Sequence, residues 1–286
     1  MSNHRTGFRR MVISLPQNIG NEVAIDAAAE LAEVLNLELL ANFIADSTLH
    51  ELAGFPLREL RLPGEGWQTI DLAEITREMD RAAGIARRLF AAAVGRRAIK
   101  TSFDVVPGAE VTASHISAGD IVAIIEPAHP GERITRQFAG LLDAALATAG
   151  GILIVPRRIV RSAGPVVALA TGAADPGIGP ALEITAALKE RLILAMPAPA
   201  PLAADVVSEA RQLGVQIDQV KEGGLIGLFG LTPALTGAKE RLRVLTHGRV
   251  PQDAYRLFSM LHGVPLLVIE PGRAQLAPKN KEVEAG

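Results

Sequence analysis

The stretch RMVISLPQNIGNEVAIDAAAELAEVLNLELLANFI, residues 10–44, contains a strand-like run, an amphipathic run and a second strand-like run. The first run, residues 10–14, is short and rich in β-branched side chains, and the last, residues 37–44, is apolar enough to be buried on both faces. Between them, residues 21–36 repeat apolar side chains at helical spacing. This order predicts two parallel strands joined by a right-handed helical crossover.

The same alternation continues to residue 155. Further strands are predicted at residues 99–106, 119–126 and 151–155, and helices at residues 71–94, 109–116 and 133–148. The residues between the second strand and the long helix are polar and irregular, with several Pro and Gly. Strands that alternate with helices predict a parallel sheet with helices on both faces, which is a doubly wound α/β fold.

The pattern then restarts after RRIVRSAG, residues 157–164, a short charged segment that we interpret as a linker. Strands are predicted at residues 165–170, 192–196, 215–220, 242–246 and 264–269, and helices at residues 179–189, 202–213 and 252–262. This is an internal repeat of domain length. We therefore predict two tandem domains, residues 1–156 and 165–272, followed by a flexible tail at residues 273–286.

The composition narrows the class of protein. The chain has 286 residues, 49% of them hydrophobic, which is enough for two domains of ordinary size. The formal net charge of -2 and the absence of a basic stripe argue against a nucleic-acid partner. Without cysteine, disulfides, thiolate metal sites and thiol catalysis are excluded, and no His/Asp/Glu spacing resembles a metal site. No apolar run is long enough for a membrane span or a signal peptide, so we expect a soluble, cytoplasmic protein.

Each half resembles the universal stress protein domain. The segments that carry the resemblance are VISLPQNIGNEVAIDAAAELAEVL (residues 12–35), GDIVAIIE (119–126), ATAGGILIVP (147–156) and LHGVPLLVIEP (261–271). The resemblance covers residues 10–156 and 165–270, and it implies two domains with the adenine nucleotide alpha hydrolase-like fold. In this family two such domains pair through their last strands. The resemblance therefore implies an intramolecular pseudo-dimer in which residues 151–155 lie beside residues 264–269.

The stretch EPAHPGERITRQFAG, residues 126–140, stands where nucleotide-binding members of that family hold ATP. Their loop reads Gly, two residues, Gly, nine residues, Gly, then Ser or Thr, because glycines let backbone N–H groups approach phosphate oxygens. Here the first glycine is missing, Gly131 and Gly140 are about one residue too close together, and Leu141 replaces the hydroxyl residue. Leu15 and Leu169 stand where the acidic residue that contacts the nucleoside belongs.

Both loops nevertheless keep residues suited to an anion. These candidate site residues are His129, Gly131, Arg133 and Gly140 in the first half, and His247, Gly248 and Arg249 in the second. Imidazole, guanidinium and a helix N-terminus can together bind an anion, and the alternative is an ordinary solvated turn. Similarly, TGAADPGIG, residues 171–179, is either a phosphate cradle or a strand-to-helix turn with Asp175 or Thr171 as a local cap. We favour the turn, because no Gly-Lys-Ser/Thr follows.

These observations predict a non-catalytic stress-response protein, a regulatory or binding module with vestigial nucleotide sites and no required cofactor. One alternative is an ATP-binding protein or weak ATPase that uses the loop at residues 126–140. Another is a scaffold that binds a protein partner through an apolar segment such as residues 223–238. Whether the chain also forms homo-oligomers is left open.

Overall fold

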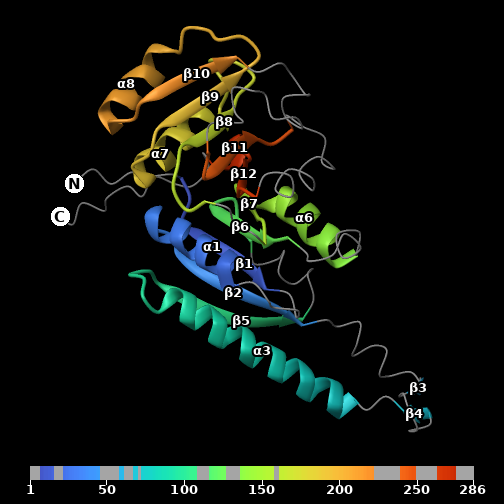
Figure 1. Cartoon of the computed structure of the whole chain (residues 1–286). Helices are drawn as coiled ribbons and strands as arrows, with labels where there is room; N and C mark the ends of the chain where they lie inside the picture. The colour runs from blue at the N-terminus through green and yellow to red at the C-terminus, as the bar shows by residue number, and fades with distance from the viewer. Residues whose placement is uncertain are drawn as a thin grey trace, which may run out of the picture.

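The computed structural model describes residues 7–15, 22–45, 58–60, 67–69, 72–107, 116–126, 136–157, 161–221, 239–248 and 263–274. Within these ranges ten strands form one sheet in the order β10-β9-β8-β11-β12-β7-β6-β1-β2-β5 (Figure 1). The strands are β1 (Arg10–Leu15), β2 (Glu38–Ala45), β5 (Thr101–Pro107), β6 (Asp120–Ile125), β7 (Gly151–Val155), β8 (Val166–Leu169), β9 (Leu192–Met196), β10 (Ile217–Lys221), β11 (Leu242–Thr246) and β12 (Leu266–Ile269).

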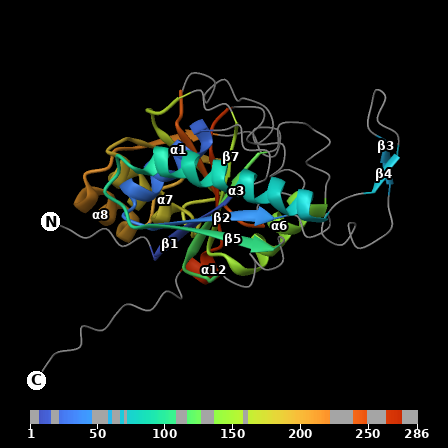
Figure 2. The same ribbon diagram turned by 90° about the horizontal axis from the view of Figure 1, so that it is seen from below.

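Helices cover both faces of this sheet, which confirms the predicted doubly wound α/β fold. The described helices are α1 (Glu22–Val34), α3 (Leu72–Val94), α6 (Arg136–Thr148), α7 (Ile178–Leu188), α8 (Ala204–Leu213) and α12 (Pro271–Ala274). Helices α1, α3, α7 and α8 pack on one face, and α6 packs on the other. Figure 2 shows α1 and α3 on the same side of β2 and β5. The helices predicted at residues 109–116 and 252–262 fall almost entirely outside the described residues.

The last strand of each half pairs with the other across the centre of the sheet. Strands β7 and β12 are antiparallel, with Gly151 opposite Ile269 and Ile154 opposite Leu266, whereas the other strand pairs of this sheet are parallel. This confirms the expected pairing of residues 151–155 with residues 264–269. Outward from this junction, each half places its strands in the same order: fifth, fourth, first, second and third.

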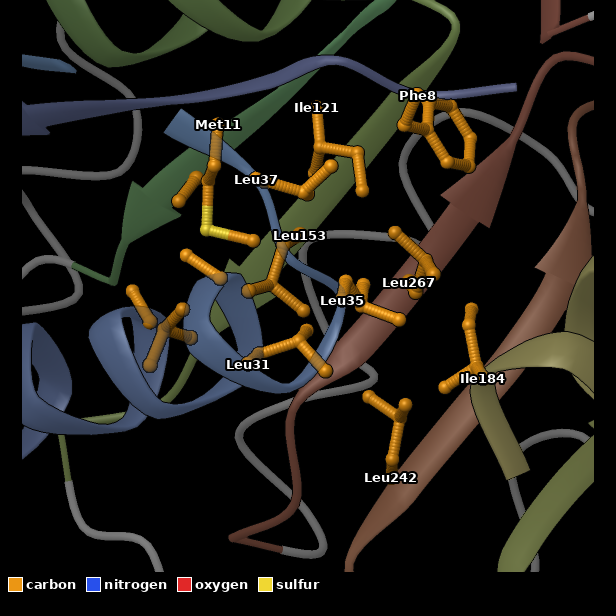
Figure 3. Packing of buried hydrophobic residues seen from close by; sticks show 14 of the residues in the cluster. Phe8, Met11, Leu31, Leu35, Leu37, Ile121, Leu153, Ile184, Leu242 and Leu267 are labelled. Atoms are coloured by element: carbon orange, nitrogen blue, oxygen red, sulfur yellow. The ribbon is translucent and has the colours of Figure 1, made fainter. Parts of the chain in front are cut away.

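One hydrophobic cluster crosses the β7–β12 junction. It contains Met11 and Leu153 from the first half together with Leu242 and Leu267 from the second, all buried. Figure 3 shows Met11 and Leu153 near helix α1, with Leu267 and Leu242 on the side of the second half. A strand buried on both faces needs a nearly continuous apolar sequence. This explains why short apolar runs in the sequence predicted the positions of these strands. The two halves therefore share a core on this face of the sheet.

Two local features were not predicted. Residues 58–60 (β3) and 67–69 (β4) form a small antiparallel hairpin within the stretch expected to be irregular. Three-residue strands flanked by Pro and Gly are too short to show a period of two. Arg273, the first residue of the expected tail, lies in α12 and donates from Nη1 to the carbonyl oxygens of Leu146 (2.8 Å) and Ala149 (3.5 Å) at the end of α6. In the described part of the chain, no helix is both long enough and apolar enough to cross a membrane.

Candidate ligand site at the carboxyl ends of the strands

Open parallel sheets bind ligands beyond the carboxyl ends of their strands. In the second half, two of the described loops at this edge contain the stretches that the sequence analysis singled out. Residues 170–177 follow β8, and residues 247–248 follow β11. Strands β8 and β11 are hydrogen-bonded neighbours, so the two loops lie next to each other.

Asp175 joins these two loops. Its carboxylate is buried, with 6% of the residue exposed. Oδ1 accepts hydrogen bonds from the amide of Gly177 (2.9 Å) and the hydroxyl of Thr246 (2.7 Å). Oδ2 accepts from the amide (2.9 Å) and the hydroxyl (3.0 Å) of Thr171. One side chain thus fixes the loop after β8, the residue before α7 and the end of β11.

The environment of Asp175 favours its ionised form. Burial raises the pKa of this carboxyl, but the hydrogen bonds donated by Thr171, Thr246 and Gly177 outweigh burial and lower the pKa below its ordinary value. The negative charge lies beside the start of α7, where the helix dipole stabilises an anion. The carboxylate therefore uses donors that would otherwise be available to an anionic ligand at this edge.

Gly177 allows the close approach of the two loops. A Cβ at this position would lie 2.6 Å from the hydroxyl oxygen of Thr246, which is too short for a real contact. In TGAADPGIG, Gly177 thus makes room for the side chain of Thr246 rather than for a ligand. The turn interpretation of this stretch agrees with the structure, since Asp175 bonds locally to Thr171 and Gly177. The bond from Asp175 to Thr246 was not expected from the sequence.

His247 is bound to an acidic residue. Its Nδ1 lies 2.6 Å from Oε2 of Glu270, just after β12, and its backbone N–H donates to the carbonyl of Ile269 (2.7 Å). Gly248 follows with a φ of +80°, a left-handed conformation that suits glycine. His247 and Gly248 follow each other directly after β11, and the carboxylate of Glu270 lies beside the imidazole. Arg249 lies outside the described residues.

In the first half, His129, Gly131 and Arg133 lie outside the described residues, as does the apolar segment at residues 223–238 in the second. Gly140 is an exposed residue inside α6, and a Cβ there would meet no atom within 4 Å. Leu141 and Leu15 are buried in the hydrophobic clusters on opposite faces of the sheet. The positions at which the nucleotide-binding pattern requires a hydroxyl and an acid therefore contribute to the core of this chain.

Two buried polar residues in the first half were missed by the sequence analysis. Ser14 on β1 and Asn42 on β2 are opposite each other in the strand register, with 3% and 1% exposed. In the described part of the chain, Ser14 Oγ and Asn42 Nδ2 have no hydrogen-bond partner. A buried polar group without a partner costs about 1–3 kcal/mol. The signal that could have found them is a polar residue between two apolar neighbours in the interior of each strand.

Among the described residues, no group of three or more His, Asp or Glu side chains is placed to bind a metal ion. In that part of the chain, His247 and Glu270 form a pair and not a larger cluster.

No family model matches this sequence, and no curated protein matches it. Two similar solved structures come from Pseudomonas aeruginosa. One, from strain UCBPP-PA14, is described as a "Putative Universal Stress Protein"; it is 13% identical over 95% of this chain and 99% of its own, with a TM-score of 0.45. The other, a functionally unknown protein from strain PAO1, is 13% identical over 96% of this chain and 99% of its own, with a TM-score of 0.47. Because both TM-scores are below 0.5, the fold is assigned from the strand order and not from these two structures.

Proposed function

We propose that the chain is a tandem universal stress protein-like module, with domains at residues 1–156 and 165–272, that acts in the cytoplasm as a non-catalytic regulatory or binding protein. The matching strand order of the two halves supports the tandem division, and so does the antiparallel pairing of β7 with β12. The resemblance of residues 12–35 and 119–126 to that family supports the assignment of the class.

We further propose that the nucleotide site of the second half is vestigial. The observation that carries this proposal is the buried carboxylate of Asp175, which bridges β8 and β11 with bonds to Thr171, Gly177 and Thr246. Glu270 adds a second carboxylate at the same edge, 2.6 Å from the ring of His247. Two carboxylates oppose a polyphosphate by charge, and Asp175 already uses the hydroxyl and amide donors.

Titration calorimetry with Mg-ATP tests this proposal. We expect no binding tighter than about 100 μM, equivalent to about -5.5 kcal/mol, and no ATP hydrolysis above that of buffer. Tighter binding that is lost when His129 and Arg133 are both changed to alanine would instead support the ATP-binding alternative at residues 126–140. Tighter binding that survives this double change would place a nucleotide elsewhere and contradict both assignments.

A second candidate function is the binding of a polar small molecule in the first half. Buried Ser14 Oγ and Asn42 Nδ2 favour it, because they lie side by side near the carboxyl ends of two parallel strands. The pair Ser14→Ala and Asn42→Leu separates this function from a structural role. If the groups serve a ligand, the double variant loses binding in a metabolite screen by thermal shift. If they are only unpaired core groups, the variant gains stability and binds as the wild type does.

The tandem division has its own test. A fragment of residues 1–157 would expose the edge of β7 that pairs with β12 in the full chain. We expect the fragment to form a dimer in analytical ultracentrifugation, with β7 pairing antiparallel with its own copy. A folded, monomeric fragment at about 100 μM would argue that β7 is not a domain-pairing strand.

A further inference from the structure

A half-open pocket of about 230 Å³ lies at the β7–β12 junction, on the face covered by α1 and α7. Its apolar lining includes Leu31 from α1, Leu153 from β7 and Leu242 from β11. Figure 3 shows Leu31 and Leu242 on either side of the junction. Leu242 begins β11, whereas Thr246 ends it. The pocket is therefore at the opposite end of the second-half strands from Asp175, and it is independent of the function proposed above.

Four charged residues line this pocket, and three of them already have partners. Glu30 Oε1 accepts from Nη2 of Arg241 at 2.9 Å, and the Arg241 side chain is only 13% exposed. Asp26 Oδ1 pairs with Arg97 at 2.6 Å. Glu190, just outside the lining, lies 4.0 Å from Nη1 of Arg241 and accepts the amide of Gly164.

Arg161 is the fourth charge. It lies in the segment between β7 and β8, and it is half-buried. Within the described ranges, neither a hydrogen bond nor an ion pair engages its guanidinium. A guanidinium presents a planar fork of donors that matches a carboxylate. The pocket thus combines an apolar floor, two neutralised acids and one cation without a partner.

We propose that this pocket binds a small amphipathic monocarboxylate, whose carboxylate pairs with Arg161 and whose apolar part rests on Leu31, Leu153 and Leu242. The carboxylates of Asp26 and Glu30 at the same pocket disfavour a multiply charged anion such as a phosphate ester. An amine would gain little, because both acids are already paired with arginine. Because the floor comes from both halves, the ligand stabilises the junction when it binds.

Hexanoate is a suitable probe, with 1-hexanol as the uncharged analogue and hexylamine as the charge-reversed one. Titration calorimetry on the full chain at low ionic strength should detect hexanoate with a Kd tighter than about 1 mM. Hexanol should bind about tenfold more weakly, because it forms no charge-assisted hydrogen bond with Arg161. Hexylamine should show no measurable binding.

Two variants and one control locate the site. Arg161→Gln should weaken hexanoate binding at least about tenfold and leave hexanol binding unchanged. Ala27→Leu places a larger side chain from α1 into the pocket and should reduce the binding of both ligands. Arg96→Gln, which removes an exposed arginine outside the lining, should bind hexanoate as the wild type does. Urea unfolding of each variant confirms that it is folded.

The proposal is overturned if the wild type does not bind hexanoate at millimolar concentration. It is also overturned if Arg161→Gln binds hexanoate as tightly as the wild type, since the carboxylate would then have another partner. Equal binding of hexanol and hexanoate would mean that the pocket takes apolar molecules without selecting a carboxylate, which contradicts the role of Arg161.

Discussion

Replacing Asp175 with alanine tests the central contact of the second-half edge. The change leaves the amide of buried Gly177, the amide of exposed Thr171 and the hydroxyl of Thr246 without their acceptor. The hydroxyls of Thr171 and Thr246 can rotate toward other acceptors and the amide of exposed Thr171 can bind water, but the amide of buried Gly177 has neither option. At about 1–3 kcal/mol for the unsatisfied amide of Gly177 and about 0.5–1 kcal/mol for each of the other three hydrogen bonds lost, we expect Asp175→Ala to lower the free energy of unfolding by about 3–5 kcal/mol at pH 7.

Urea unfolding followed by circular dichroism measures this effect. The midpoint should fall while the slope of free energy against urea stays the same, since the fold is unchanged. Asp104→Ala, which removes an exposed aspartate from β5, is the matched control and should cost less than about 0.5 kcal/mol. Thr246→Val removes one donor, and a double-mutant cycle with Asp175→Ala should give a coupling energy of about 1 kcal/mol.

The pH dependence supplies a second readout. Because the pKa of Asp175 is lower in the folded chain than in the unfolded chain, its ionised form stabilises the fold above the unfolded pKa of about 3.9. This contribution is lost as the pH falls through the folded pKa. The difference between the wild type and Asp175→Asn should therefore be constant above about pH 5 and shrink below about pH 4. A cost for Asp175→Ala under about 1 kcal/mol, or a difference that does not shrink in acid, would refute the reasoning.

Three further changes give distinct outcomes. Gly150→Ala would place a Cβ 2.2 Å from the carbonyl oxygen of Ala118, so it should lower the unfolding free energy by at least about 2 kcal/mol in urea titration; an unchanged midpoint would contradict this packing. Arg273→Gln removes a charged donor to the last turn of α6 and should lower the unfolding free energy by about 1–2 kcal/mol in the same assay. Salt screens a charge effect, so this cost should become smaller at about 1 M salt, and a cost that stays the same would count against the charge explanation. Burial and the nearby charge of Glu209 raise the pKa of Glu183 to about 7, so the stability of the wild type should fall as the pH rises from about 4.5 to 7. Glu183→Gln should therefore be more stable than the wild type at about pH 8, and thermal unfolding that shows no such gain would disprove the raised pKa.

The ten strands of the sheet could be predicted from the sequence, each within two residues of its observed bounds. A strand buried on both faces must be apolar along its length, and this property is local in the chain. The pairing of residues 151–155 with 264–269 was implied by the family resemblance, not by any local pattern. The hairpin at residues 58–60 and 67–69 was missed because its strands are too short to carry a period.

The candidate site was only partly predictable. The sequence identified the loops after β8 and β11, because strand-to-helix turns with Gly and Asp are recognisable locally. The bond from Asp175 to Thr246 spans 71 positions, and the pair of His247 with Glu270 spans 23. Sequence spacing carries no information about which loops become neighbours when the strand order departs from the chain order.

The sequence alone therefore determined the class of fold, the positions of its strands and the departure of both loops from a nucleotide-binding pattern. Each of these depends on the residue types within a few positions of one another. The tertiary structure decided that the two halves share a core across β7 and β12, that Asp175 bridges two loops, and that Arg161 faces a pocket lined by both halves. These features depend on side chains that meet only after the sheet has formed, because hydrogen bonds and contacts act over a few ångströms in space and not along the chain.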